Sequence, residues 1–176
     1  MSIHELFGGA ITAIAPVNLI DASEIRQVPD TQEVLLYPDS DASIIVEVLE
    51  RVQPSDYREA VKFHFDSLAH DNSATDSSVV SVDIVLNDRG DGTPAIISLS
   101  GTQKIQKFNR EAVDDVQILM ALYRVEQKNV DLVVTFNVPT QTETGGGLDE
   151  HGAQLVRSQF EQFTRSLKIV DFGLFA

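Results

Sequence analysis

The 176-residue sequence has no cysteine and no tryptophan, few basic residues and no long apolar run. Without cysteine the chain can form no disulfide, no thiolate metal site and no cysteine nucleophile, which fits a reducing compartment. No apolar stretch approaches the roughly 18 residues needed to cross a bilayer, so we expect no membrane partner. The N-terminal MSIHELFGG lacks a basic segment followed by a long apolar one, so we expect no secretory signal.

Basic residues are scarce relative to acidic ones. The sequence has 13 lysines and arginines against 27 aspartates and glutamates, a formal net charge of −14. We therefore expect no nucleic-acid partner, because phosphates are bound by clusters of lysine and arginine. Residues 21–50 hold eight acids and one base, a net of −7 that is half of the total. This segment predicts either a solvated surface or a face that steers a basic partner, and both remain open.

Apolar residues make up 43% of the chain and charged residues 23%, the usual balance of a globular protein. The length is sufficient for a substantial core, so we expect one domain over residues 1–176. Alternating segments predict strands, which fall at 10–16, 32–38, 43–52, 79–86, 95–108, 115–127 and 130–139. The last two are expected to pair as a hairpin around Lys128–Asn129, and the closing residues 168–176 are expected to form a short strand and tail.

Apolar steps of three and four predict two long helices. The first is expected over 54–72 with Ser55 as its cap, followed by a polar connection over 69–78. The second is expected to bury Leu155, Val156, Gln159, Phe160, Phe163 and Leu167. A single helical turn is expected at 21–27, capped by Asp21 or Ser23. Hairpin-paired strands with two long helices predict an α+β fold, an antiparallel sheet covered by helices.

No motif indicates an enzyme active site or a metal site. His64 lies between Phe63 and Phe65, and we expect it to be hydrogen-bonded at the edge of the core. NDRGDG at 87–92 lacks the regular oxygen ligands of a calcium loop and predicts a tight hairpin. TGGGLDE at 144–150 lacks the Lys-Ser/Thr pair of a phosphate loop and predicts, with its neighbours, a flexible loop over 140–150. We expect no metal, no cofactor and no catalytic residue.

The stretch VPDTQEV at 28–34 places two acids, Asp30 and Glu33, behind Pro29 and ahead of an apolar run. A helix cap would need a helix to follow, but EVLLYP is β-prone. The pair is therefore predicted to belong to a turn that leads into a strand, and Pro29 stiffens that turn and lowers the entropy cost of presenting the acids. We expect both side chains to be exposed on one ridge.

Several segments together resemble the Mog family of Ran-binding proteins, also called Ran guanine nucleotide release factors. They are ELFGGAITAIAP, LIDASEIRQVPDTQEV, SIIVEVLE, KFHFDSLA, LSGTQKIQKFN and DLVVTFNVP, in this order. The resemblance implies an antiparallel sheet with helices on both faces, related to the PsbP-like fold. It also implies binding to the GTPase Ran, release of its guanine nucleotide and support of nuclear import, in nucleus and cytoplasm and without enzymatic chemistry. The alternative is a small-molecule-binding or hydrolytic domain of a PsbP-like fold.

The resemblance also implies a set of Ran-binding residues. The two acids of the family's P-D-x-Q-E block are implicated in Ran binding, and they fall on Asp30 and Glu33. Gln32, Asp21 and Arg26 are secondary candidates because they flank these acids, and they serve equally well as a turn amide, a cap and a local salt-bridge residue. Ran is the expected partner of a monomeric chain, with a further Ran-binding protein left open.

Overall fold

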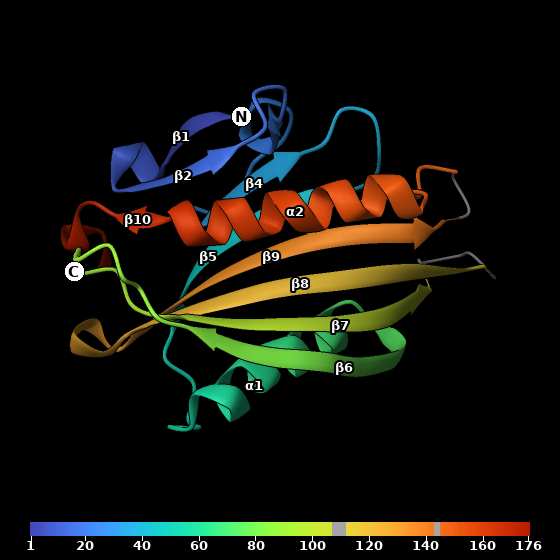
Figure 1. Ribbon diagram of the computed structural model, residues 1–176. Helices are drawn as coiled ribbons and strands as arrows, with labels where there is room; N and C mark the ends of the chain where they lie inside the picture. The colour runs from blue at the N-terminus through green and yellow to red at the C-terminus, as the bar shows by residue number, and fades with distance from the viewer. Residues whose placement is uncertain (107–111, 143–144) are drawn as a thin grey trace.

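The computed structural model describes residues 1–106, 112–142 and 145–176 (Figure 1). In these residues a three-stranded sheet has the order β1-β2-β10, and a seven-stranded sheet has the order β3-β4-β5-β9-β8-β7-β6. All paired strands are antiparallel. The strands are β1 (Ser2–Leu6), β2 (Ile11–Ala15), β3 (Ile20–Asp21), β4 (Gln32–Leu36), β5 (Ser43–Glu50), β6 (Ala74–Val85), β7 (Ile96–Gln106), β8 (Val113–Val125), β9 (Val130–Gln141) and β10 (Lys168–Ile169). The helices are α1 (Tyr57–Asp71) and α2 (Glu150–Ser166), with short 3-10 turns η1 (Phe7–Gly9), η2 (Ala22–Glu24), η3 (Glu126–Lys128) and η4 (Phe172–Phe175).

The predicted α+β class and antiparallel sheet are confirmed. Each predicted strand has a counterpart, and the hairpin of β8 and β9 turns through η3 with Asn129 in the left-handed conformation, at a φ of 55°. β1 and β3 are additional strands that the apolar pattern did not predict. The predicted strand at 95–108 and the predicted loop at 140–150 each extend into residues outside the described part, 107–108 and 143–144.

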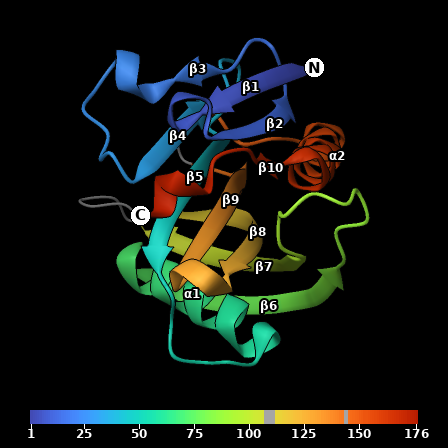
Figure 2. The ribbon, with the colours of Figure 1, turned by 90° about the vertical axis from the view of Figure 1, so that its left-hand side faces the viewer.

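The apolar density of β8 has a direct structural reason, because its two faces contribute to different clusters. Ile118, Met120 and Leu122 pack in a cluster with α1. The residues between them, Leu119 and Ala121, pack in a second cluster that contains α2 and the three-stranded sheet. Figures 1 and 2 show α1 and α2 on opposite sides of β6–β9. Side chains alternate across a strand, so only a strand apolar at successive positions can serve both clusters.

α1 begins one residue later than its predicted cap implies. Asp56, directly before the first helical residue, accepts a 3.0 Å hydrogen bond through Oδ1 from the backbone N–H of Glu59. The prediction of Ser55 as the cap is therefore wrong, because a cap must directly precede the first turn to reach its free N–H groups. The helix then packs Phe65 into a space left by Gly101 of β7, where an added Cβ would lie 2.7 Å from the Phe65 ring.

The predicted polar connection at 69–78 is wrong. α1 continues to Asp71, Ser73 turns the chain with a φ of 54°, and β6 starts at Ala74. β6 is polar and exposed at its start, but it pairs along β7 from Ala74 opposite Ile105 onward. The ladder of backbone hydrogen bonds thus extends the strand beyond the apolar segment that marks it in the sequence.

α2 confirms most of the predicted apolar face, with one exception. Val156, Phe163 and Leu167 are buried, and the rings of Phe160 and Phe163 contact Phe136 edge-on. Leu155 is 55% exposed, so its predicted burial is wrong. It precedes the buried Val156 by one position, and one residue turns a helix by about 100°, which places Leu155 beside the buried face instead of on it.

Candidate protein-binding surface

The acidic segment 21–50 folds into one end of the seven-stranded sheet, since it contains β3, β4 and β5 in neighbouring positions. Its approach to β4 is a tight turn, in which the N–H of Gln32 donates to the carbonyl of Pro29 at 3.0 Å. Asp30 occupies the tip of this turn and is exposed. The N–H of Val48 donates to the carbonyl of Thr31 at 2.9 Å, so β5 fixes the turn from the other side. The predicted turn before a strand is confirmed.

Glu33 differs from Asp30 in its surroundings. It is half-buried, and its Oε1 accepts a 2.7 Å hydrogen bond from the backbone N–H of Phe7. Phe7, Gly8 and Gly9 have φ angles of 52°, 67° and 94°. Residues other than glycine rarely adopt positive φ angles of this kind. The expectation of two exposed acids is right for Asp30 and wrong for Glu33, because Glu33 also anchors the η1 turn from 26 residues away.

The three secondary candidates have separate surroundings. Gln32 donates from Nε2 to Oε2 of Glu47 on β5 at 3.0 Å, so it is a strand residue and not a turn amide. Asp21 caps η2 by accepting from the N–H of Ser23 at 2.9 Å, as the cap interpretation predicted. Arg26 is exposed and forms no ion pair with any residue in the described ranges, which contradicts a local salt bridge.

These five residues do not form one compact cluster. Asp21 pairs opposite Leu35, near the end of β4, whereas Asp30 precedes the start of β4. Asp30 and Gln32 therefore share one end of the strand and Asp21 lies at the other. The segment presents acidic side chains along the β3–β5 end of the sheet, an arrangement that suits contact with a basic surface.

The predicted hydrogen-bonded histidine is confirmed, and it is buried as part of an ionic cluster. His64 Nε2 and Asp131 Oδ2 are 2.8 Å apart, and Arg124 Nε donates to Asp131 Oδ1 at 2.8 Å. All three side chains are buried. Burial by itself raises the pKa of Asp131, but hydrogen bonds from His64, Arg124 and the Val52 N–H outweigh it and lower this pKa to about 2. The cluster joins α1 to β8 and β9, and its geometry is that of a structural ion pair.

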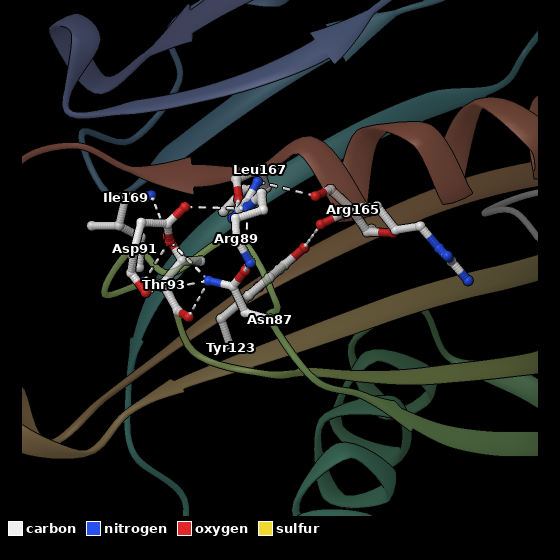
Figure 3. Close-up of polar contacts among 9 residues, drawn as sticks. Asn87, Arg89, Asp91, Thr93, Tyr123, Arg165, Leu167 and Ile169 are labelled. Carbon is white, nitrogen blue, oxygen red and sulfur yellow. Dashed lines mark hydrogen bonds and ion pairs between the residues drawn. The ribbon is translucent and has the colours of Figure 1, made fainter.

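The NDRGDG segment forms a long connection between β6 and β7 over residues 86–95, so the hairpin is confirmed but its predicted tightness is wrong. Arg89 donates to the carbonyls of Arg165 at 3.0 Å and Leu167 at 2.8 Å, at the C-terminal end of α2 (Figure 3). Asp91 pairs with Arg89 at 3.2 Å and accepts from Asn87 Nδ2 at 2.8 Å. The connection thus caps the C-terminal end of α2.

No group of three or more histidine, aspartate or glutamate side chains suited to hold a metal ion occurs within residues 1–106, 112–142 and 145–176. Across the same residues no helix has the length and apolar character to span a membrane.

Comparison with known proteins gives a consistent result. The family model of the Ran-interacting Mog1 protein matches residues 4–139. The Ran guanine nucleotide release factor of Homo sapiens is 37% identical over 176 residues, which cover 97% of this chain and 94% of the human protein. The nuclear import protein MOG1 of Saccharomyces cerevisiae is 32% identical over 188 residues, covering 98% of this chain and 84% of the yeast protein.

Solved structures agree with the sequence matches. The crystal structure of the Saccharomyces cerevisiae Ran-binding protein Mog1p superposes with a TM-score of 0.77 at 31% identity, over 99% of this chain and 98% of the yeast chain. A mutant of Mog1 superposes equally well, with a TM-score of 0.77 at 32% identity. From the family model over most of the sequence, and from relatives above 30% identity over nearly all of it, the chain belongs to the Ran-interacting Mog1 protein family.

Proposed function

We propose that this protein binds the GTPase Ran and promotes release of its guanine nucleotide, in support of nuclear protein import. Similarity over nearly the whole chain to proteins named as Ran guanine nucleotide release factors carries this proposal. The protein acts as a single-domain, non-enzymatic regulator in the nucleus and cytoplasm. We further propose that its fold is related to the PsbP-like fold, with α1 and α2 on the two faces of the antiparallel sheet.

The contact residues that we propose are Asp30, Glu33, Gln32, Asp21 and Arg26. Asp30 is the principal one, because it is exposed at the tip of a turn that is hydrogen-bonded on both sides. A rigid turn loses little conformational entropy when it binds a partner. Glu33 contributes mainly by its place beside Asp30 in this surface, because its Oε1 already accepts a hydrogen bond from the Phe7 N–H. Asp21 and Arg26 extend the surface along β3 and η2.

The mechanism that we propose is displacement of the nucleotide without covalent chemistry. A GTPase holds its nucleotide through a lysine, backbone amides and Mg²⁺. The Asp30 or Glu33 carboxylate competes for that lysine or disturbs the surroundings of the metal ion. A protein that binds the nucleotide-free GTPase more tightly must weaken nucleotide binding by the same factor, because coupling between two ligands is reciprocal.

The experiment measures release of a fluorescent guanine nucleotide from Ran as this protein is added. We expect faster release with the wild type and no phosphate production by the protein alone. Asp30→Lys is expected to reduce binding by at least about tenfold, since loss of a desolvated charge pair costs about 2–5 kcal/mol. The control Asp88→Lys makes the same charge change in the β6–β7 connection, beyond the other edge of the sheet, and should release nucleotide like the wild type.

Two results would contradict the proposal. Nucleotide hydrolysis by the isolated protein would indicate an enzyme. Undiminished release by a variant that lacks the carboxylates of both Asp30 and Glu33 would exclude the displacement mechanism, even if the protein still binds Ran.

A further inference from the structure

A groove lies between α1 and β5 on the α1 side of the seven-stranded sheet. α1 packs mainly against β6, β7 and β8. The helix therefore leaves the adjoining surface of β9 and β5 partly uncovered, and this surface lines the groove. Figure 2 shows the C-terminal end of β5 next to α1. Met120 of β8 and Val133 and Thr135 of β9 form the floor of the groove, and all three are buried. The groove is therefore built from regular elements that hold its shape.

The walls of the groove are apolar and partly accessible. Leu49 of β5, Val52 after β5 and Leu68 of α1 line it, and each is half-buried against the cluster beneath α1. A partner side chain placed between them would remove the rest of their surface from water, which is the main source of affinity at protein interfaces. The groove thus suits an apolar side chain.

The rim of the groove is acidic. Glu47 and Glu50 border it on the β5 side and Asp71 borders it on the α1 side, and none of the described residues that line it is a lysine or arginine. Within the described ranges neither Glu50 nor Asp71 forms an ion pair. Asp71 is also the last residue of α1, where the negative end of the helix dipole disfavours a carboxylate. A basic partner would relieve both this effect and the mutual repulsion of the three acids.

The groove is continuous with the proposed Ran-binding turn. Glu47 on its rim accepts the 3.0 Å hydrogen bond from Gln32, two residues after Asp30. The next residue of β5, Val48, donates to the carbonyl of Thr31 in the same turn. A partner that contacts Asp30 therefore meets the end of the groove without crossing another element.

We propose that the α1–β5 groove is a second contact surface for the GTPase, and that it binds a basic segment of Ran carrying one apolar side chain. The apolar side chain enters between Leu49 and Leu68, and lysine or arginine side chains on either side pair with Glu50 and Asp71. This inference rests on the proposed function, and it extends the interface from the Asp30 turn onto the opposite wall formed by α1.

The test compares equilibrium binding of nucleotide-free Ran to the wild type and to three variants. Glu50→Lys combined with Asp71→Lys is expected to weaken binding at least tenfold, with little change in melting temperature because both residues are exposed. Leu68→Ala is expected to weaken binding several-fold. Asp66→Lys controls for a single charge reversal on α1, since Asp66 lies on this helix outside the groove lining, and its binding should remain within twofold of the wild type.

A second measurement does not depend on any variant. Amide hydrogen exchange of the wild-type protein should slow in residues 47–52 and 64–71 when Ran is bound. Wild-type affinity in the Glu50/Asp71 double variant, together with unchanged exchange in these residues, overturns the groove proposal while the proposed function stands. Failure of the wild type to bind Ran in any nucleotide state overturns both.

Discussion

Asp30 and Glu33 of the VPDTQEV stretch carry the same charge, but they contribute differently to the binding surface and to stability. Asp30 is exposed at the tip of its turn, whereas Glu33 holds the backbone N–H of Phe7 at 2.7 Å. Substitution of Asp30 changes mainly the binding surface. Substitution of Glu33 also releases the N-terminal turn, so its effect on binding must be separated from its effect on stability.

Glu33→Ala is expected to lower the free energy of unfolding by about 1–3 kcal/mol, because a partly buried N–H loses its acceptor. Asp30→Ala should change it by less than about 0.5 kcal/mol, as surface substitutions usually do. Urea unfolding measures both. Glu33→Gln keeps the side-chain oxygen and removes the charge, so it should recover most of the stability. Equal unfolding free energies for Asp30→Ala and Glu33→Ala would show that the bond to Phe7 contributes nothing.

Because the pKa of Asp131 is lowered in the folded protein, we expect the free energy of unfolding to fall at acidic pH. Its pKa falls from 3.8 to about 2 on folding, so its stabilising contribution is fully present above pH 4 and is lost as the pH falls through 2. Asp131→Asn should cost about 3–5 kcal/mol at pH 7, because it leaves the buried charge of Arg124 without its partner.

The difference in unfolding free energy between the wild type and Asp131→Asn should shrink by about 2 kcal/mol between pH 4 and pH 2. Unfolding both proteins in the same buffers cancels the protonation of other carboxylates. A constant difference across this range would mean that Asp131 titrates normally in the folded protein.

At the scale of elements, the connection between β6 and β7 stabilises the end of a helix that is distant in sequence. Arg89 satisfies two carbonyls at the C-terminal end of α2, and the N–H of Ile169 in β10 donates to Thr93 Oγ1 at 3.0 Å (Figure 3). The last carbonyls of a helix have no partner within it, and a cation at this end also interacts favourably with the helix dipole. The connection therefore holds α2 and β10 in place together.

Arg89→Ala is expected to destabilise the protein by about 1.5–3 kcal/mol, the range for hydrogen bonds that involve a charged group. Amide exchange should accelerate in residues 163–169 more than in α1. Arg165→Ala is the control, since its ion pair with Glu161 is exposed and such pairs contribute about 0–1 kcal/mol. Unchanged exchange at the end of α2 would contradict the capping role.

At the scale of the whole molecule, the fold gathers half of the net charge at one end of the seven-stranded sheet. An asymmetric charge of this kind accelerates encounter with a basic partner, and salt screens the effect over a Debye length of about 8 Å at 0.15 M ionic strength. The asymmetry therefore bears on the rate of association more than on the stability of the fold.

The association rate constant with Ran is expected to fall when ionic strength rises from 0.05 M to 0.5 M, while the dissociation rate changes little. Stopped-flow fluorescence measures both rates. Asp39→Asn combined with Asp41→Asn should flatten the salt dependence, because these acids belong to the same segment. An association rate that does not respond to salt would exclude electrostatic steering by this end of the molecule.

Much of the fold could be predicted from local sequence, because a strand or helix leaves its period in consecutive residues. β5, β8 and β9 follow from alternating or continuous apolar residues, and α2 follows from the spacing of Val156 and Phe163. The turn at Asp30 follows from Pro29 and the β-prone segment behind it. β6 shows the limit of local pattern, since its polar first half becomes a strand only through pairing with β7.

The α+β class, the acidic segment, the turn that exposes Asp30 and the family to which the chain is similar could all be inferred from the sequence. These properties depend on residue type and short-range spacing. The folded chain was needed to show that Glu33 bonds to Phe7, that Arg89 caps α2 and that Glu50 and Asp71 border one groove. Each of these arrangements brings together residues at least 21 positions apart, as the residue numbers show. Sheet register and helix packing fix such contacts, and neither is encoded in the residues next to them.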